Sequence, residues 1–530
     1  MKRFITLLIA LSLTACSTGS SLWGVPSTPT PRDPNLPSPA SETPFPIPTD
    51  TLVPTEPPIP TETSIPIPTL MPTGMPTQTL VQVFAPNPQS QQIMYYAQSG
   101  DSLKAVAARF DVEVGEITSP KNLPFVGLVD EGTLLIIPDR IKGEKTPNIQ
   151  LIPDSEIIFS NSATSFDVAA FVKNAGGFLA SYKQWITSTG WTESTDVIDQ
   201  LSRSNSVNPR ILLALLEYES GWVYGTPTDM FREQYPMGFQ IQDDDQGLYK
   251  QLQWAVNQLF AGYYGWRMGT LTELTFPNGE TLRLAPDLNA GTVALQYFFS
   301  RQRNRAEWVS VLDPDSYSGF PAFYTRMFGD LAARARIDSP IFPTGIVQPD
   351  LVLPFKVDDQ WNYTSGPHGA WDRTGPLAAI DFAPASNHKG CDPSSLWAVA
   401  AAPGVVVRSE TGIVVVDLDG DGNEQTGWDL IYMHMGEQGR IPVGQWVQVD
   451  DRIGHPSCEG GASTGRHIHF ARKFNGEWII ADSALPFILS GWLIHAGDIP
   501  YKGTMTNGTH LVTADPYGQV WSVIVRLPNE

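Results

Sequence analysis

The chain has 530 residues and a formal net charge of −21, because 55 acidic residues outnumber 34 basic ones. This length predicts several domains. The negative charge disfavours nucleic acid as a partner, and it also disfavours electrostatic adhesion to anionic polymers.

The first sixteen residues predict an export signal. Lys2 and Arg3 give a positively charged start, and residues 4–13 form an apolar core that is too short to span a bilayer. The following Leu-Thr-Ala-Cys sequence resembles the lipobox of bacterial lipoproteins, which implies cleavage before Cys16 and lipid on its sulfur. An ordinary signal peptide with an incidental cysteine is the alternative. We expect an exported chain anchored by lipid to the extracytoplasmic face of the cell envelope, without a membrane-spanning segment.

Residues 17–90 predict a disordered stalk. Nineteen of the 46 prolines lie here, together with many Thr and Ser residues. Proline lacks the N–H group that helices and sheets require, and it restricts the residue before it. We expect a semi-rigid, polyproline-like spacer between the anchor and the folded domains.

Residues 93–139 predict a small α/β module. Residues 106–110 carry apolar side chains at helical spacing after a capping Asp101 or Ser102, and residues 132–138 form a strand pattern that ends at proline. The Ser-Gly-Asp-Ser-Leu sequence and the terminal Ile-Ile-Pro resemble the LysM module. The resemblance implies two strands flanking two helices, and affinity for glycans that contain N-acetylglucosamine. A spacer domain without glycan affinity is the alternative.

A helical pattern extends over residues 155–345. Asn208 and Pro209 suit an N-cap followed by proline at the first helical position, and the apolar run over residues 211–220 then stops at glycine. A second run, residues 248–266, also places apolar side chains at helical spacing. We therefore expect a mostly α middle domain.

The Asn-Pro-x-x-Leu-Leu-Ala-Leu-x-Glu-x-Glu-Ser-Gly sequence resembles the catalytic helix of lysozyme-like lytic transglycosylases. The resemblance implies that Glu219 is a general acid, since burial at an apolar helix end can raise the pKa of a carboxyl group. Residues 238–242 and 289–291 match the other elements of that family loosely. A degenerate domain that positions the enzyme or holds glycan is therefore favoured over an active glycosidase. The aromatic candidates for holding glycan, for each of which a place in the core is the alternative, are Trp222, Trp254 and Trp266.

After the middle domain the composition changes to β-branched residues, glycines and turns. Residues 405–407, 412–416 and 430–434 are short apolar runs separated by Gly and Asp clusters. Short strands at regular spacing predict an antiparallel sheet, so we expect an all-β domain over 350–500 and a β extension over 501–530. The predicted fold is thus multidomain, with a small α/β module, a mostly α middle domain and an all-β C-terminal domain.

All eight histidines lie at or after position 368. His467 and His469 are two residues apart in an apolar run, so in an extended chain both imidazoles point to one face. Two imidazoles on one face can bind or flank zinc, although an isolated pair favours a polar sheet face. The further histidines in the same third of the chain favour a metal site.

Four motifs of this region contain the candidate site: Gly366-Pro367-His368-Gly369, Ala379-Ile380-Asp381-Phe382, Tyr432-Met433-His434, and the run from Ser463 to Phe470. Together they resemble the lysostaphin and beta-lytic family of zinc metallopeptidases, which hydrolyse peptidoglycan peptides. The common form of that family has His four residues before Asp, where this chain has Leu377. The beta-lytic branch separates the two residues more widely, and His368 lies thirteen residues before Asp381. The site is therefore interpreted as intact.

The resemblance implies that His368, Asp381 and His469 hold a zinc ion (Zn2+), with a fourth position for water. It places His434 and His467 beside the metal, where one takes the proton of the water and the other stabilises the oxyanion.

Two neighbours of these residues have open roles. Tyr432 shares a face with His434 in a regular strand, so it either contacts substrate or packs in the core. Arg466 stands where the family has proline, and it either touches substrate or lies in solvent. The other histidines match no motif and are interpreted as structural: His388, His455, His495 and His510.

Besides Cys16 the chain contains Cys391 and Cys458, and such a pair in an exported domain favours a disulfide over free thiols. A zinc-binding pair is disfavoured because no Cys-x-x-Cys spacing exists.

Asp417, Asp419 and Asp421 resemble a calcium loop, but position twelve is Trp428 in place of Glu. A polar hairpin turn is therefore favoured over a calcium site.

The sequence predicts an exported, lipid-anchored hydrolase of the cell wall that uses zinc to cleave peptide bonds, with peptidoglycan as its partner. One alternative is a non-catalytic wall-binding protein that activates other hydrolases. The other is a lytic transglycosylase that acts through Glu219.

Overall fold

The computed structural model describes residues 91–385, 390–392 and 394–528. The predicted export signal, Cys16, the stalk and His388 lie outside these residues. Within the described part of the chain, none of the helices is both long and apolar enough to cross a membrane.

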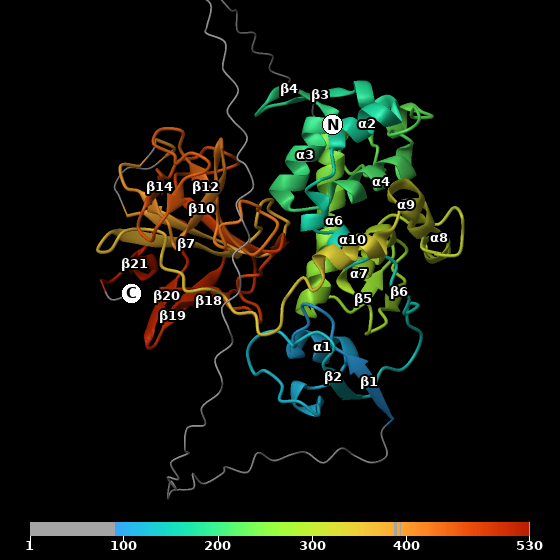
Figure 1. Ribbon diagram of the computed structural model, residues 1–530, viewed down its shortest axis with the longest axis horizontal. Coiled ribbons are helices and arrows are strands. Elements are labelled where there is room, and N and C mark those ends of the chain that lie inside the picture. Colours follow the sequence, from blue (N-terminus) through green and yellow to red (C-terminus); the bar gives the residue numbers. More distant parts are fainter. Residues whose placement is uncertain (1–90, 386–389, 393, 529–530) are drawn as a thin grey trace, which may run out of the picture. The chain divides into compact units, whose positions relative to one another are not determined.

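The N-terminal module consists of a two-stranded antiparallel sheet and one α-helix (Figure 1). Its elements are β1 (Gln92–Tyr96), α1 (Leu103–Phe110), the 3-10 helix η1 (Val114–Glu116) and β2 (Leu134–Pro138). Ser102 caps α1 by accepting a hydrogen bond from the backbone N–H of Ala105. Only this α-helix forms among the described residues of the module, although the sequence predicted two helices. The second is replaced by η1 and a loop that contains Pro120 and Pro124, which lack the N–H groups that an α-helix requires.

The middle part is mostly helical, as expected, and it also contains two short hairpins, β3–β4 and β5–β6. Its helices and strands are α2 (Val168–Ala175), β3 (Lys183–Ile186), β4 (Gly190–Glu193), α3 (Ser194–Asn205), α4 (Pro209–Ser220), α5 (Met230–Gln234), α6 (Leu248–Met268), β5 (Glu273–Thr275), β6 (Thr281–Arg283), α7 (Ala290–Ser300), α8 (Arg305–Val311), α9 (Phe320–Phe328) and α10 (Leu331–Asp338). Short 3-10 helices are η2 (Asp154–Glu156), η3 (Asn161–Ala163), η4 (Phe178–Ser181) and η5 (Asp243–Asp245).

The long helix α6 is the centre of the middle part. It packs along α7 and also contacts α3 and α4. A Cβ atom on Gly262 of α6 would lie 2.8 Å from Ala294 Cα and 2.8 Å from Tyr297 Cβ, both in α7. The close approach of the two helices therefore requires glycine at this position.

The C-terminal part contains a nine-stranded sheet in which every neighbouring pair is antiparallel, as predicted. Eight strands follow the order β13-β10-β11-β12-β15-β8-β7-β21, and β16 pairs with β15. The strands are β7 (Gln360–His368), β8 (Ala379–Pro384), β10 (Gly404–Glu410), β11 (Gly412–Asp417), β12 (Trp428–Met435), β13 (Trp446–Val447), β15 (Ile468–Phe474), β16 (Glu477–Trp478) and β21 (Val523–Val525). A separate pair is formed by β9 (Ala398–Val399) and β14 (Arg452–Gly454).

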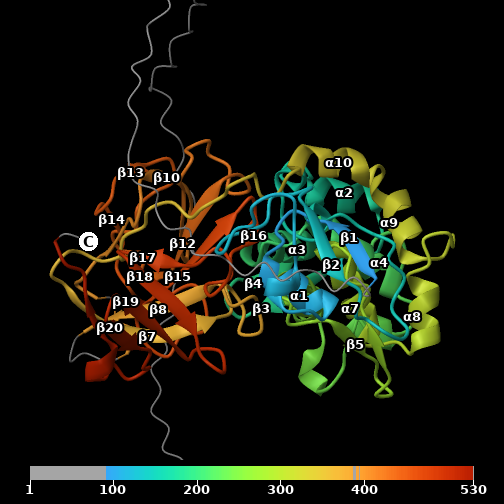
Figure 2. The same cartoon turned by 90° about the horizontal axis from the view of Figure 1, so that it is seen from below.

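A smaller four-stranded sheet lies beside β7 (Figure 2). It is formed by β17 (Ile488–Leu489), β18 (Trp492–Ala496), β19 (Gly503–Asn507) and β20 (His510–Thr513), and the 3-10 helix η6 (Val520–Ser522) follows. The boundary that the sequence suggested at residue 500 therefore falls between the paired strands β18 and β19.

The two faces of the large sheet belong to different apolar cores. Ile413 and Val415 of β11 are part of a core that also contains the helices of the middle part. Val414 and Val416 belong to a second core, which also includes residues of the smaller sheet. Because alternate residues of a strand point to opposite faces, the β-branched run buries both of its sides.

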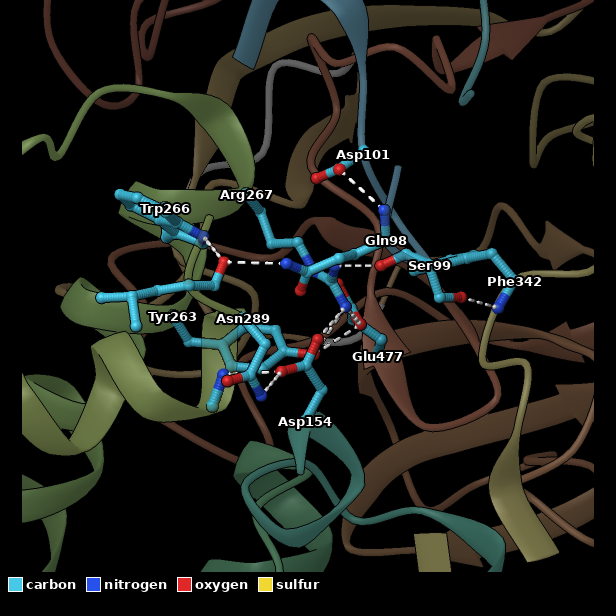
Figure 3. Close-up of polar contacts among 12 residues, drawn as sticks. Gln98, Ser99, Asp101, Asp154, Tyr263, Trp266, Arg267, Asn289, Phe342 and Glu477 are labelled. Atoms are coloured by element: carbon cyan, nitrogen blue, oxygen red, sulfur yellow. Dashed lines mark hydrogen bonds and ion pairs between the residues drawn. The ribbon is translucent and has the colours of Figure 1, made fainter. Parts of the chain in front are cut away.

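Arg267 of α6 joins three parts of the chain (Figure 3). Its guanidinium forms ion pairs with Glu477 of β16 and with Asp154, and it donates a hydrogen bond to the carbonyl oxygen of Ser99. Arg267 and Glu477 are both buried. The large sheet, the middle part and the N-terminal module therefore meet at one buried charge.

Candidate metal centre

The register of the sheet brings Asp381 and His469 together. They are direct partners in the antiparallel pair β8–β15, so their side chains project from the same face. His469 Nδ1 lies 3.3 Å from Asp381 Oδ1.

His368, the last residue of β7, reaches the same point from the other side of β8. The register of β7 and β8 shifts between Ser365 and His368. His368 Nε2 lies 3.0 Å from His469 Nδ1 and 3.3 Å from Asp381 Oδ1. The structure thus brings together the three residues that the sequence proposed as metal ligands.

The hydrogen bonds of the two histidines define which ring nitrogens are protonated. His368 Nδ1 donates to the carbonyl oxygen of Gly366 and His469 Nε2 donates to that of Ala370, each at 2.9 Å. A carbonyl oxygen can only accept, so in a neutral ring His368 Nε2 and His469 Nδ1 carry lone pairs. Such second hydrogen bonds also fix the orientation of the rings.

Three electron-pair donors therefore face one another at 3.0 to 3.3 Å. Asp381 Oδ1 is buried, and it has no hydrogen-bond partner in the described part of the chain. Two imidazole nitrogens and one carboxylate oxygen form a donor set typical of catalytic zinc sites. The residues present therefore fit a zinc ion.

The charges at the site shift the pKa values of these groups. Burial alone would raise the pKa of Asp381, but His368 and His467 outweigh it and hold this pKa well below its usual range. Burial would lower the pKa of His368, but the Asp381 carboxylate outweighs it, so the pKa of His368 is raised. Burial lowers the pKa of His469. Asp381 is thus held as a carboxylate.

His434 and His467 lie next to this cluster, with their ring centres 4.4 Å apart. His434 Nδ1 donates to the carbonyl oxygen of Glu459 at 2.9 Å, and His467 Nδ1 donates to that of Gly465 at 2.7 Å. The Nε2 atom of each neutral ring is therefore unprotonated. His467 Nε2 lies 3.7 Å from Asp381 Oδ1. Burial, and then His467 and His469, lower the pKa of His434 to about 3.

Tyr432 does not share a face with His434, in contrast to the sequence-based expectation. His434 has a left-handed backbone conformation, with φ of 63°, which breaks the alternation of β12. Tyr432 is fully buried in the core on the opposite face, and its hydroxyl oxygen accepts a hydrogen bond from the backbone N–H of Ala401. Tyr432 is therefore a core residue. A left-handed conformation is uncommon for residues other than glycine, and such conformations cluster at functional sites.

A disulfide joins Cys391 to Cys458, with their Cα atoms 5.1 Å apart. Cys458 is adjacent to Glu459, whose carbonyl oxygen orients His434. Next to the loop of Cys391, the backbone N–H of Arg466 donates to the carbonyl oxygen of Gly390, and its side chain donates to that of Asp392. The bridge therefore connects two segments. One contains Glu459, whose carbonyl oxygen orients His434, and the other contacts Arg466, next to the Gly465 carbonyl oxygen that orients His467.

The structure assigns other contacts to the remaining described histidines. His455 donates from Nδ1 to the carbonyl oxygen of Leu396 and packs on the ring of Trp397. His495 Nε2 lies 2.8 Å from Thr506 Oγ1, and His510 is exposed on β20.

Glu219, the candidate glycosidase acid, lies in the last turn of α4 and forms an ion pair with Arg303. Arg303 Nη2 lies 2.7 Å from Glu219 Oε1 and 2.8 Å from Oε2. Burial raises the pKa of Glu219, whereas Arg303 lowers it, and the net shift is upward. Of the aromatic candidates, Trp222 and Trp266 are fully buried, and Trp254 stacks on Phe239 with ring centres 4.8 Å apart. Two of the three therefore offer no face to a glycan.

Sequence reasoning missed Tyr501, whose ring stacks on that of His368 with centres 4.5 Å apart. It also missed Trp185 and Trp191 on the β3–β4 hairpin, which are 61 % and 71 % exposed and lie edge to face. The two tryptophans on either side of Gly190 could have indicated an exposed aromatic hairpin. Tyr501 is far from His368 in the sequence and lies outside the recognised motifs, so no local pattern reveals its contact.

Comparison with known proteins gives two kinds of similarity. Residues 150–339 match the family model described as the N-terminal domain of LasA. The chain is also 24 % identical over 367 residues to the protease LasA of Pseudomonas aeruginosa strain UCBPP-PA14, which covers 64 % of this chain and 77 % of the relative. The aligned part of this chain, 64 % of its length, is longer than the segment 150–339, so the match to the protease continues beyond the middle part. The chain is therefore similar in sequence to a protease, and its middle part is similar to the N-terminal domain of LasA.

Two solved structures are also similar to parts of the chain. One is the M23 metalloprotease pseudoalterin from the deep sea, at 23 % identity and a TM-score of 0.28, covering 34 % of this chain and 100 % of that chain. The other is the catalytic domain of the antimicrobial peptidase lysostaphin from Staphylococcus simulans, at 22 % identity and a TM-score of 0.15, covering 23 % and 81 %.

Proposed function

We propose that the chain is a zinc-dependent metalloendopeptidase that hydrolyses peptide bonds of peptidoglycan. The observation that carries the proposal is the convergence of His368 Nε2, His469 Nδ1 and Asp381 Oδ1, next to two further imidazoles. The match to a protease over most of the chain supports it.

His368, Asp381 and His469 would hold the zinc ion through these three atoms. When bound, zinc polarises a peptide carbonyl and lowers the pKa of water to about 7. Asp381 supplies the negative charge of the site, and the carbonyl oxygens of Gly366 and Ala370 orient the two imidazoles.

His434 and His467 are the proton-transfer groups in this proposal. His434 Nε2 is an acceptor, because its Nδ1 is committed to the carbonyl oxygen of Glu459. His467 Nε2 lies 3.7 Å from Asp381 Oδ1, beside the three proposed ligands, so in this proposal the protonated form of His467 is the group that stabilises a developing oxyanion. The His467 side chain is 16 % exposed, more than those of His368, Asp381 and His469, which suits contact with substrate.

The substrate and the location follow from the sequence motifs. The resemblance of the four histidine and aspartate motifs to lysostaphin and beta-lytic enzymes favours peptidoglycan peptides as the substrate. The LysM-like module at residues 93–139 would bind the glycan strands, and lipid on Cys16 with the proline-rich stalk would hold the enzyme at the envelope surface.

A glycan-cleaving activity through Glu219 is the less favoured function. Burial raises the pKa of Glu219, as a general acid requires, but both of its carboxylate oxygens accept hydrogen bonds from Arg303 Nη2, so the group is engaged with the protein and not with a glycosidic oxygen. The second alternative is a non-catalytic activator of other hydrolases, which needs no metal.

The test is zinc analysis of the whole chain, followed by digestion of purified peptidoglycan. We expect one equivalent of zinc and release of peptide amino groups, without new reducing ends or anhydro-sugars. Glu219→Gln should digest like the unmodified chain, and His469→Ala should release no amino groups. A chain without zinc or amino-group release would support the activator. Anhydro-muramyl products that disappear in Glu219→Gln but persist in His469→Ala would show a second active site.

A further inference from the structure

The turn between β11 and β12 gathers three carboxylates. Oxygen atoms of Asp417, Asp419 and Asp421 lie within 4.8 Å of one another. Asp417 is buried, whereas the other two are exposed. An acidic turn of this kind is by itself an ordinary hairpin connection.

A fourth carboxylate, Asp429, distinguishes this turn from an ordinary one. Asp429 is fully buried, and both of its carboxylate oxygens are without a hydrogen-bond partner among the residues that the structure describes. A buried carboxylate without a partner is costly. Burial raises the pKa of Asp429 well above its usual range; Lys473 opposes this rise, and Glu424, Asp417 and Asp419 add to it.

The backbone directs Asp429 towards the acidic turn. Asp417 and Asp429 are direct partners in the antiparallel pair β11–β12, so both side chains project from the same face. A Cβ atom on Gly427 would lie 2.2 Å from Asp419 Oδ2, so the Asp419 carboxylate lies against the start of β12. Glycine at position 427 is what allows this approach.

The nearby cations do not balance these carboxylates. Arg408 Nη2 and Lys473 Nζ both lie against Glu424 Oε1, at 2.7 and 2.5 Å. The other four carboxylates of the group are Asp417, Asp419, Asp421 and Asp429, so the negative charges outnumber the positive ones. Hard divalent cations with oxygen ligands meet this need, and calcium tolerates irregular carboxylate geometry better than magnesium does.

We propose that the β11–β12 turn is a calcium site, with Asp417, Asp419 and Asp421 as ligands and Asp429 as the fourth carboxylate. Position twelve of the turn lacks the usual Glu, but Asp429 follows at position thirteen and supplies the acid from the paired strand. The site lies at a junction, because Asn423 of the turn donates a hydrogen bond to Asn161 Oδ1 of the middle part at 2.8 Å. Calcium therefore orders a segment that joins the sheet to the helices.

The test uses the full chain, depleted of divalent cations and then reloaded with one equivalent of zinc. Titration with CaCl2 in a calorimeter should show one further equivalent bound, and magnesium should bind more weakly. At about a hundredfold excess over the Kd, calcium should raise the Tm of the full chain by roughly 3 °C. Neither readout requires peptidase activity, so the result is independent of the proposed function.

Variants separate a ligand role from a purely structural one. Asp429→Asn and Asp419→Asn should each weaken calcium binding by on the order of tenfold or more. In the absence of calcium Asp429→Asn should unfold at the same temperature as the unmodified chain or higher, because it replaces a buried carboxyl group whose ionisation is unfavourable by a neutral amide. Asp515→Asn, in another turn where the carboxylate accepts a backbone N–H, is the matched control and should bind calcium normally.

Absence of calcium binding, equal binding of magnesium, or an unchanged affinity in the variants would overturn the proposal. If Asp429→Asn does not fold, Asp419→Asn gives the answer, because its carboxylate is exposed.

Discussion

Arg267 and Glu477 form a buried, bidentate ion pair between α6 and β16 (Figure 3). Arg267 Nε lies 3.0 Å from Glu477 Oε1, and Nη2 lies 3.1 Å from Oε2. The hydroxyl of Tyr263 donates to Glu477 Oε2 at 2.7 Å, and Asp154 Oδ2 lies 2.9 Å from Arg267 Nη2. Both carboxylates and the hydroxyl are therefore organised around one guanidinium.

Breaking this pair should destabilise the chain strongly. Glu477→Gln leaves Arg267 buried with a weaker partner, so we expect a loss of about 3–5 kcal/mol in the free energy of unfolding. The measurement is denaturant unfolding followed by tryptophan fluorescence. Glu193→Gln is the matched control, because its pair with Lys183 is exposed and should contribute about 0–1 kcal/mol. Equal effects of the two substitutions would contradict the prediction.

The three metal ligands should act as a unit. Replacing His368, Asp381 or His469 by Ala should abolish zinc retention and peptidase activity together, since each supplies one of three donors. Zinc analysis by mass spectrometry after gel filtration, with an amino-group release assay, measures both. Normal zinc content in His368→Ala would remove this residue from the site. His510→Ala, on an exposed strand, is the control and should change neither property.

Loss of the two flanking histidines should separate metal binding from turnover. His434→Ala and His467→Ala should keep zinc but lose turnover by about a hundredfold or more, the effect of removing a proton-transfer or oxyanion group. The assay compares kcat with zinc content in the same preparations. Loss of zinc in either variant would show that the ligands have been assigned wrongly.

The disulfide should support catalysis without supporting metal binding. In the double variant Cys391→Ser and Cys458→Ser, the loop that carries the carbonyl oxygen of Glu459 loses its tether, so His434 is held less firmly. We expect kcat to fall by about 10–100-fold while zinc content stays normal. This is the usual effect of losing a group that orients a histidine of a metal site through a hydrogen bond. A double variant with full kcat would show that the bridge does not position this group.

Glu424 should make stability depend on pH in the acid range. Burial opposes ionisation of Glu424, but Arg408 and Lys473 outweigh it and lower the pKa of Glu424 below its ordinary value of 4.5. The folded state then binds the proton less readily than the unfolded chain, so this stabilisation is complete above pH 4.5 and is lost as the pH falls through the lowered pKa.

Glu424→Gln should therefore flatten the fall in unfolding free energy below pH 4.5 relative to the unmodified chain. Glu410→Gln, which removes an exposed pair with Arg203, should leave the pH profile unchanged. Denaturant unfolding at a series of pH values measures this, and identical profiles for Glu424→Gln and the unmodified chain would contradict the assignment.

Local patterns predicted the elements of the fold well. Asn208 caps α4 by accepting the backbone N–H of Arg210, and Pro209 occupies the first helical position, as the sequence indicated. These features depend on neighbouring residues, so they can be seen in the sequence. The antiparallel strands of the large sheet were likewise visible as short β-branched runs between turns.

Features that depend on pairing between distant segments could not be predicted. The left-handed backbone at His434 moves its imidazole away from the face of Tyr432, and no residue type in the motif signals this conformation. The position of Asp429 opposite Asp417 follows from the register of β11 and β12. The three metal ligands could be predicted only because the motifs around His368 and Asp381 resemble a known family. A separation of thirteen residues in the sequence does not determine how close the two side chains lie.

The apolar core that continues from the helices onto one face of the sheet determines what a break in the chain would do. Residues 343–345, between the two parts, are exposed, so a protease can reach this connection. Cleavage there would not release the fragments, because separation would expose Ile413, Val415 and other buried side chains to water. A nicked chain should therefore migrate as one species under native conditions and as two under denaturing conditions.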